Sequence, residues 1–328
     1  MPLKKEISER ENLELVLAGE KPAWVPSYSD AFSTAGYRSI GRKKDPVTDY
    51  NVDVWGVAFT QTIDGPIPVN TATQKFELED ITKWRDHMPD VNLKNIDWEE
   101  DARFIMTEQI KEGRMINFSA GMTWEQLHYM MGFEGALLAL ATEPEATFDF
   151  LSAMADFYVE AMRYQFKYLK PDLVMMMDHV ATARGLLMSP AQYREIIKPC
   201  QKKMYDAMID LGVPWPEMHV DGYVDEILPD YIEMGIKVIQ PFQVFNDVEK
   251  WKKEYGIACI GGWDAFGTGN HVDSTEEEIR ESVRLAMDTY APTSKYIYWE
   301  SGATPRFGNL PILQDEAQKY GLAFYDNR

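Results

Sequence analysis

A histidine and an aspartate lie two residues apart at the end of one apolar segment. Met218-His219-Val220-Asp221-Gly222 closes a hydrophobic run and precedes a helical pattern. Because side chains at positions i and i+2 share one face of a strand, the His219 imidazole and the Asp221 carboxylate are expected to point the same way. The two groups could be ligands of a zinc ion, which needs three or four N, O or S donors, or they could form a hydrogen-bonded pair. The spacing is compatible with both interpretations.

A second carboxylate and imidazole follow a run of methionines. Met175-Met176-Met177 precedes Asp178 and His179. Methionines make a soft and adaptable wall, and a histidine at a strand end can titrate near neutral pH. The methionines are expected to fill the core, whereas Asp178 is expected either to face a functional cavity or to cap a helix or turn.

Other reactive groups are weaker candidates. Cys200 lies in a helical pattern and Cys259 in an apolar strand pattern, so both are expected to be inert core thiols. The glycine-rich segment 260–269 lacks the lysine of a phosphate-binding loop and does not follow a dinucleotide fingerprint. It is predicted to be a loop that carries an aromatic wall.

The composition excludes several classes of protein. The 328 residues include 33 Lys+Arg and 53 Asp+Glu, a formal net charge of −20. This charge repels phosphate groups, so nucleic acid and anionic membranes are not expected as partners. No apolar run is long enough to span a membrane, and the first residues lack an apolar signal core. With only two cysteines, the protein is expected to be cytoplasmic.

Apolar or β-branched segments alternate with long amphipathic patterns, which predicts a parallel α/β sheet. The expected strands are Pro22–Tyr28, Val54–Thr60, Met115–Ala120, Leu173–His179, Trp215–Val220, Val238–Phe242, Ile257–Gly262 and Tyr296–Glu300. The expected helices include Glu125–Ala139, Glu145–Leu169, Pro190–Leu211, Asp225–Met234 and Thr275–Thr289. With about eight repeats, a closed TIM (β/α)8 barrel formed by a single domain over residues 1–328 is favoured, and an open doubly wound sheet is the alternative.

In such a barrel, chemistry takes place where the strands end. Residues 51–101 are rich in turn signals and are expected to form an excursion over one mouth of the barrel, a potential lid. Many aromatic residues lie near the proposed strand ends. They would suit a flat apolar ligand, or they could simply fill the barrel.

Five segments, in order, resemble the uroporphyrinogen decarboxylase superfamily from about residue 20 to the C-terminus. They begin FSAGMTWEQL at Phe118, DLVMMMD at Asp172, MSPAQYREIIKP at Met188, HVDG at His219 and ESGATP at Glu300. The resemblance implies a TIM barrel, in agreement with the strand count.

The true decarboxylases of that superfamily bind a substrate with eight carboxylates through an arginine-rich stretch after the first strand. The matching region here, Trp24–Ser33, contains no arginine and adds Asp30. Substrate carboxylates would stay unpaired in such a site, which is costly for buried charges. The resemblance therefore favours the other branch, the cobalamin-dependent methyltransferases, which exchange methyl groups with a separate corrinoid protein.

Members of this branch that methylate thiols hold zinc on a His-x-Cys pair and a later cysteine. His219 matches that histidine, but Asp221 stands in place of the first cysteine and Glu300-Ser301 occupies the last strand end. These departures argue against coenzyme M. The resemblance instead implies demethylation of a methoxylated aromatic, with the methyl group passing to the Co(I) corrinoid of the partner protein. A methylamine or thiol donor and a non-catalytic corrinoid-binding barrel are the alternatives.

An aryl methyl ether reacts only when its leaving oxygen is protonated or bound to a Lewis acid. Under this interpretation the catalytic candidates are His219, Asp221 and Asp178. The expected ligands of a zinc ion are His219, Asp221 and Glu300, and without zinc these groups would present the acid. The expected substrate-binding residues are Tyr28, Trp24, Phe118, His179, Trp263 and Phe266.

Overall fold

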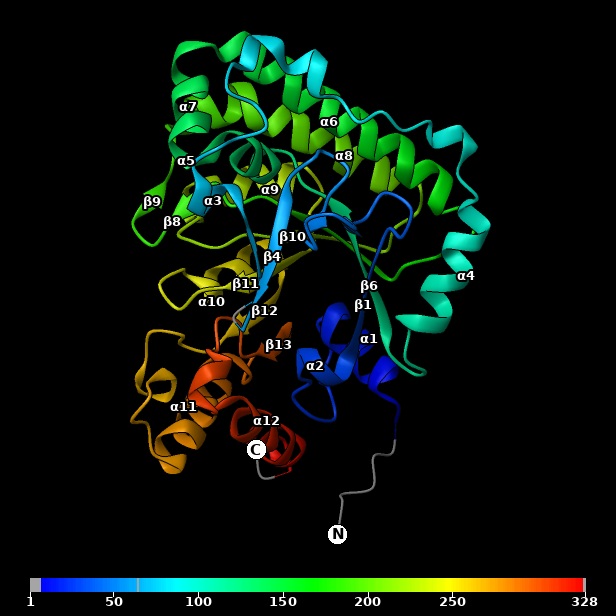
Figure 1. Cartoon of the computed structure of the whole chain (residues 1–328). Helices are drawn as coiled ribbons and strands as arrows, with labels where there is room; N and C mark the ends of the chain where they lie inside the picture. Colours follow the sequence, from blue (N-terminus) through cyan, green and yellow to red (C-terminus); the bar gives the residue numbers. More distant parts are fainter. Residues whose placement is uncertain (1–6, 64, 327–328) are drawn as a thin grey trace.

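The computed structural model describes residues 7–63 and 65–326, and within these residues seven parallel strands form one curled sheet (Figure 1). The strand order is β1-β6-β7-β10-β11-β12-β13. The strands are β1 (Phe32–Gly36), β6 (Met115–Gly121), β7 (Leu173–Met177), β10 (Trp215–His219), β11 (Val238–Phe242), β12 (Ala258–Gly262) and β13 (Tyr296–Trp299). The six strands from β6 onward match predicted ones. The prediction of a parallel α/β sheet is therefore confirmed.

The first predicted strand, Pro22–Tyr28, is wrong. The chain makes an isolated parallel bridge from Ser27 to Tyr298 of β13, turns through the short helix α2 (Tyr28–Ala31), and only then forms β1. Pro26 has no N–H to donate to a ladder, although its carbonyl accepts from the Tyr298 N–H at 2.9 Å. The described residues thus show a curled seven-stranded sheet, and closure by eight strands stays a prediction.

The second predicted strand, Val54–Thr60, is also misplaced. Its end lies in β4 (Ala58–Thr62), which belongs to a separate antiparallel sheet with β2 (Lys43–Lys44), β3 (Asn51–Val52) and β5 (Gly65–Pro68). The Asp53 carboxylate accepts from the N–H groups of Trp55 and Val57, both at 2.9 Å, and so folds this stretch locally. A local turn, rather than a barrel strand, is the result.

The small sheet is part of an insertion between β1 and β6. The insertion also contains α3 (Asn70–Thr73), η1 (Ile81–His87), η2 (Leu93–Asn95) and α4 (Trp98–Glu108). It packs on the helices that follow β6: Trp55 meets Phe150 and Phe59 meets Tyr129, with ring centroids 5.9 and 5.4 Å apart. A role for this segment as a lid over the mouth stays a prediction.

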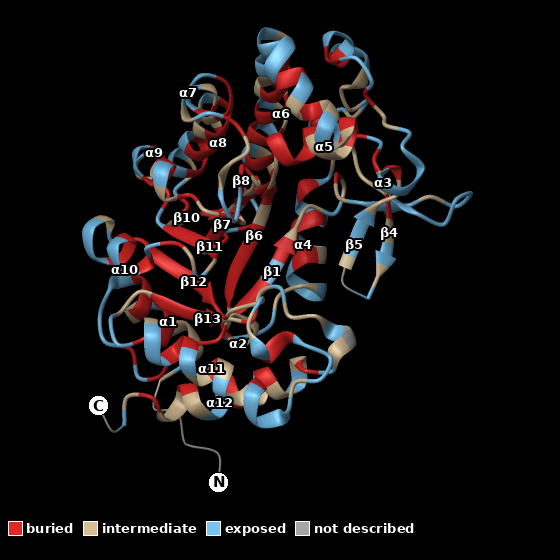
Figure 2. Cartoon of the chain, turned by 90° about the vertical axis from the view of Figure 1, so that its left-hand side faces the viewer, coloured by how far each residue is buried: buried red, intermediate tan, exposed pale blue. Residues whose placement is uncertain are grey.

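Helices cover the outer face of the sheet, and the strands between them are largely buried (Figure 2). The predicted helices are confirmed. The helices at the predicted positions are α5 (Trp124–Thr142), α6 (Pro144–Gln165), α7 (Pro190–Gln192), π-helical η3 (Tyr193–Ile197), α8 (Lys198–Asp210), η4 (Asp225–Ile227), α9 (Leu228–Glu233) and α11 (Glu276–Tyr290). The described residues also form α10 (Val248–Lys250), π-helical η5 (Trp251–Tyr255) and α12 (Leu310–Ala323). None of the helices that the structure describes is both long and apolar enough to cross a membrane.

The amino-terminal end of the curled sheet is sealed by an apolar cluster. Helix α1 (Glu9–Ala18) brings Leu13, Val16 and Leu17 against the first inward-facing residues of the strands. Those residues are Phe32, Met115, Leu173 and Val238. Polar side chains inside the sheet therefore lie nearer to its carboxyl-terminal end.

Candidate functional site

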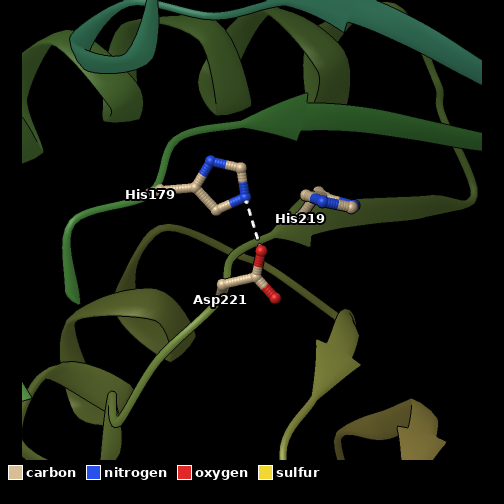
Figure 3. A group of neighbouring side chains, drawn as sticks. All are labelled: His179, His219 and Asp221. Atoms are coloured by element: carbon tan, nitrogen blue, oxygen red, sulfur yellow. Dashed lines mark ion pairs between the residues drawn. The ribbon is translucent and has the colours of Figure 1, made fainter. Parts of the chain in front are cut away.

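Three side chains from two neighbouring strand ends meet beyond the carboxyl-terminal edge of the sheet (Figure 3). Strands β7 and β10 pair in parallel with Met177 opposite His219, so His179 and Asp221 each follow two residues later. One ligand atom from each of His179, His219 and Asp221 lies within 4.8 Å of the other two. We call these three residues the strand-end cluster. The structure brings His219 and Asp221 together, and it adds His179.

His179 lies between two carboxylates. Its Nδ1 is 3.1 Å from Glu125 Oε2, and its Nε2 is 3.1 Å from Asp221 Oδ2. Burial alone would lower the pKa of His179, but the two carboxylates raise it to about 10. Burial likewise opposes ionisation of Asp221, yet contact with His179 keeps the pKa of that carboxyl below its usual value. His179 is therefore an imidazolium at neutral pH in this arrangement.

His219, in contrast to His179, has a lowered pKa and is a neutral imidazole at pH 7. Burial and the neighbouring positive charge of His179 lower its pKa to about 4. The ring centroids of the two histidines are 5.3 Å apart, and the Trp299 ring lies 6.2 Å from His219. A neutral imidazole keeps one nitrogen lone pair, so His219 can accept a proton or bind a metal.

Glu125 is the residue that fixes His179, and sequence reasoning missed it. Its Oε2 also lies 3.7 Å from Nδ1 of His128. Burial would raise the pKa of Glu125, but the two histidines hold it well below its usual range. Glu125 lies within the segment that begins at Phe118, but only the tertiary fold shows that this first turn of α5 reaches the end of β7.

Asp178 is placed as a positioning residue, and it has no access to a ligand. The carboxylate is fully buried and accepts four hydrogen bonds of 2.7–3.1 Å. The donors are Thr123 N, Thr123 Oγ1, Glu125 N and Gln201 Nε2. These bonds tie the end of β7 to the start of α5 and so position Glu125. Of the two expected roles for Asp178, the structure favours the cap.

Gln243 orients the other end of the cluster. Its Nε2 donates to Asp221 Oδ1 at 3.0 Å, and its Oε1 accepts from the Gly222 N–H at 2.9 Å. Gly222 has a φ of 104°, and a Cβ there would lie 2.7 Å from the Ala181 backbone. The tight turn after Asp221 therefore requires glycine.

A cavity of about 590 Å³ adjoins the cluster at the ends of β11, β12 and β13. Asp221 lines it together with aromatic side chains, which include Phe242, Trp263, Phe266 and Trp299. Trp263 is fixed by a 2.8 Å hydrogen bond to Ser282 Oγ, whereas Phe266 is 76% exposed. The cavity contains no lysine or arginine among its described lining residues. Trp263 and Phe266 thus both line this cavity, and their role in binding a ligand stays a prediction.

Other predicted site residues lie elsewhere. Trp24 is buried, and its indole donates to Glu9 at 3.2 Å. Phe118 points outward from β6, where its ring meets Tyr37 and Phe166 at 4.9 and 5.2 Å. Neither residue lines the cavity.

Tyr28 and Glu300 lie closer to the site. Tyr28 stacks on Trp299 at 4.5 Å and so borders the cluster. Glu300 is mostly buried, accepts from Gln314 at 3.1 Å and is not part of the strand-end cluster.

The strand-end cluster fits a metal ion better than the expected trio with Glu300. Two imidazoles and one carboxylate are a common zinc donor set, and three protein ligands leave one position for a reacting group. Glu125 and Gln243 contact His179 and Asp221 from outside the cluster, as groups that orient metal ligands do. Metal binding at this place stays a prediction.

A curled parallel sheet with polar side chains gathered beyond its strand ends defines the barrel-type class of α/β proteins. Residues 56–300 match the family described as Uroporphyrinogen decarboxylase (URO-D), and the chain belongs to that family. The resemblance expected from the sequence motifs is confirmed.

Among solved structures, the chain is similar to a methyltransferase from Methanosarcina mazei. The two share 14% identity and a TM-score of 0.63, over 96% of this chain and 99% of that one, which establishes a shared fold. A Bacillus subtilis mannanase (9% identity, TM-score 0.36) and the Bacillus subtilis YdhT protein (10%, 0.34) each cover 88% of this chain and 84% of their own. These two are too distant to inform function. No curated protein matches the chain significantly.

Proposed function

We propose that this chain is a methyltransferase that removes the methyl group of a methoxylated aromatic and delivers it to the Co(I) corrinoid of a partner protein. The observation that carries the proposal is the strand-end cluster beside an aromatic-lined cavity. Membership of the uroporphyrinogen decarboxylase family and the fold shared with a methyltransferase support the class of reaction. The absence of lysine and arginine from the described cavity lining argues against a substrate with many carboxylates.

The cavity suits a flat ring with an ether oxygen. Trp263, Phe266 and Trp299 offer stacking surfaces that hold an aromatic ring and exclude water around it. Asp221 reaches the same cavity from the cluster side. A ring held there could direct a substituent toward Asp221 and so toward the strand-end cluster.

The leaving group of this reaction is a phenolate, which needs its charge neutralised. In the absence of metal, the His179 imidazolium holds a proton at Nε2, which is buried and lies 3.1 Å from Asp221 Oδ2, so Asp221, which lines the cavity, would relay it. The pKa of His179, about 10, is close to that of a phenol. Transfer of that proton to the ether oxygen as the methyl C–O bond breaks is therefore nearly balanced, and general acid help of this kind contributes about 10²–10⁴-fold. Asp221 and Glu125 stabilise the donor before transfer.

When zinc is bound, His179, His219 and Asp221 would hold it, and it would supply a Lewis acid for the same oxygen. The residues around the cluster keep their roles in that state. Glu125 orients His179, Gln243 orients Asp221, and Asp178 fixes the start of α5.

The test is a methyl-transfer assay with the purified protein, a reduced corrinoid protein and a panel of methoxybenzenes. We expect a phenol to form in step with methylation of the corrinoid, and only when the corrinoid protein is present. Lack of transfer across the whole panel would contradict the proposal.

A second donor class is a quaternary methylamine. The carboxylates of Asp221 and Asp264 line the cavity beside several aromatic rings, and rings with nearby carboxylates attract organic cations. Methylamines and thiols tested in the same assay separate this candidate from the ether. Preferential demethylation of the amine would replace the aromatic substrate in our proposal.

A further inference from the structure

A layer of polar side chains lies inside the curled sheet, below the strand-end cluster. Along β10, Trp215, Glu217 and His219 share the inward face, because strand side chains alternate. Trp215 packs against the apolar cluster at the amino-terminal end, so Glu217 is at mid-height. The same alternation places Thr34, Asn117 and Gln240 on the inward faces of β1, β6 and β11. We call Thr34, Asn117, Glu217 and Gln240 the polar layer.

The polar layer has more acceptors than donors. Both carboxyl oxygens of Glu217 and the Oδ1 of Asn117 are buried without a hydrogen-bond partner among the described residues. The hydrogen bonds of the two amides go to other groups: Asn117 Nδ2 contacts the Tyr28 hydroxyl at 3.5 Å and Gln240 Nε2 contacts the Met175 sulfur at 3.2 Å, although both amides lie beside the Glu217 carboxyl. Buried polar groups without partners are rare and costly, so three of them in one layer indicate a missing donor.

Part of the polar layer is open to solvent. Thr34 is exposed although the residues on both sides of it are buried, and Met175 is half-buried. In the strand register, Thr34 is paired with Asn117 and Met175 with Glu217. Because α1 and its apolar cluster close the amino-terminal end, this exposure comes from the carboxyl-terminal side or from the gap between β13 and β1.

We propose that the polar layer is a substrate subsite that binds a hydroxyl group carried by the aromatic methyl ether, with Glu217 as the acceptor. This inference rests on the proposed function and names the substrate class more closely, as a methoxyphenol. Two residues of strand separate Glu217 from His219 by roughly 6.6 Å. A ring whose methoxy group lies at the strand-end cluster therefore reaches the layer with a hydroxyl on the opposite side of the ring.

Burial supports a hydroxyl as the matching group. Both carboxyl oxygens of Glu217 are buried and need a hydrogen-bond donor. A phenolic hydroxyl supplies such a donor without bringing a further charge into the sheet. A ring with a second methoxy group in place of the hydroxyl has no donor and leaves Glu217 unsatisfied.

The experiment compares 4-methoxyphenol with 1,4-dimethoxybenzene. In the wild type we expect kcat/KM to favour the phenol by roughly 10- to 100-fold, the value of one hydrogen bond to a buried carboxyl. Glu217→Met removes both oxygens at similar length and should abolish the preference through KM, and Glu217→Gln guards against a folding defect. Gln165→Met is the matched control, because the buried Gln165 also carries an unpartnered oxygen, on α6 away from the layer.

Binding of the two ethers without the corrinoid protein, followed by tryptophan fluorescence, separates the two proposals. Tighter binding of the phenol that is lost in Glu217→Met supports the subsite even if no methyl transfer occurs, in which case only the proposed function fails. Equal binding of both ethers by the wild type, or a preference that survives Glu217→Met, overturns the subsite. Tighter binding of 4-methoxybenzylamine than of the phenol also overturns it, in favour of a cation.

Discussion

The strand-end cluster and the polar layer satisfy their charges in different ways. In the cluster, His179 faces a carboxylate oxygen at 3.1 Å on each side, and Gln243 orients Asp221. In the polar layer, two neighbouring residues keep three oxygens without a donor among the described residues. The cluster is therefore preorganised without a ligand, whereas the layer completes its hydrogen bonds only when a ligand enters. Substitutions in the two regions should accordingly differ in their effects.

The largest effect is expected in the cluster. His219→Ala removes the neutral imidazole and should lower the rate of methyl transfer by about 10²–10⁴-fold. The thermal unfolding midpoint and the affinity for the methyl ether are the controls, and both should stay near the wild-type values. A variant that keeps its full rate would show that the chemistry takes place elsewhere.

The hydrogen bonds that Asp178 accepts next to the strand-end cluster should contribute to the stability of the fold. Asp178→Ala leaves buried donors of Thr123, Glu125 and Gln201 without an acceptor and should lower the free energy of unfolding by about 3–5 kcal/mol. Denaturant titration measures the change. Asp149→Ala is the matched control, since its ion pair with Arg85 is exposed and worth about 0–1 kcal/mol. Equal losses in the two variants would refute the role given to Asp178.

The contact between Glu125 and His179 should affect metal binding. Glu125→Gln weakens the orientation of His179, so we expect zinc affinity to fall by about 10–100-fold in a chelator competition. Glu134→Gln, an exposed change on the same helix, should leave the affinity unchanged. Unchanged affinity in Glu125→Gln would show that His179 needs no such support.

The polar layer should produce a pH-dependent difference in stability. Burial raises the pKa of Glu217 from 4.5 to about 8, so the folded protein holds a proton that the unfolded chain has released between these values. The wild type should thus lose stability relative to Glu217→Gln as pH rises through this window, by at most about 1.4 kcal/mol per pH unit. Above pH 8 the difference should be constant. Paired denaturant titrations from pH 4.5 to 9 in a chelator test this, and parallel curves would show that Glu217 is already ionised.

The sequence predicted the later strands well because their residues are buried on both faces. Segments such as Leu173–Met177 are continuous apolar runs, which are typical of parallel sheets. The first two predicted strands were wrong because the apolar residues of those segments belong to a short bridge, a turn and the small antiparallel sheet, and not to strands of the large sheet. Pro26 cannot donate to a ladder, and Asp53 folds the chain around Trp55 into a local turn.

From the sequence, only the site residues that lie on the same strand could be placed together. His219 and Asp221 lie on one strand end, so spacing alone places them together. His179 joins them because β7 is next to β10, which only the strand order shows. The outward position of Phe118 follows from strand alternation, since Met115 and Asn117 face inward, but the parity of β6 was not visible without the fold.

The single bridge between Ser27 and Tyr298 is the weakest connection between neighbouring segments of the curled sheet. Every other neighbouring pair of large-sheet strands is joined by a ladder, whereas β13 meets the start of the chain through one bridge and the stacked rings of Tyr28 and Trp299. Opening there breaks few hydrogen bonds, so amide exchange at Tyr298 should report a low-energy local opening. Local opening at this bridge would widen the interior of the curled sheet for a bulkier aromatic substrate, while the ladders between the other strands stay paired.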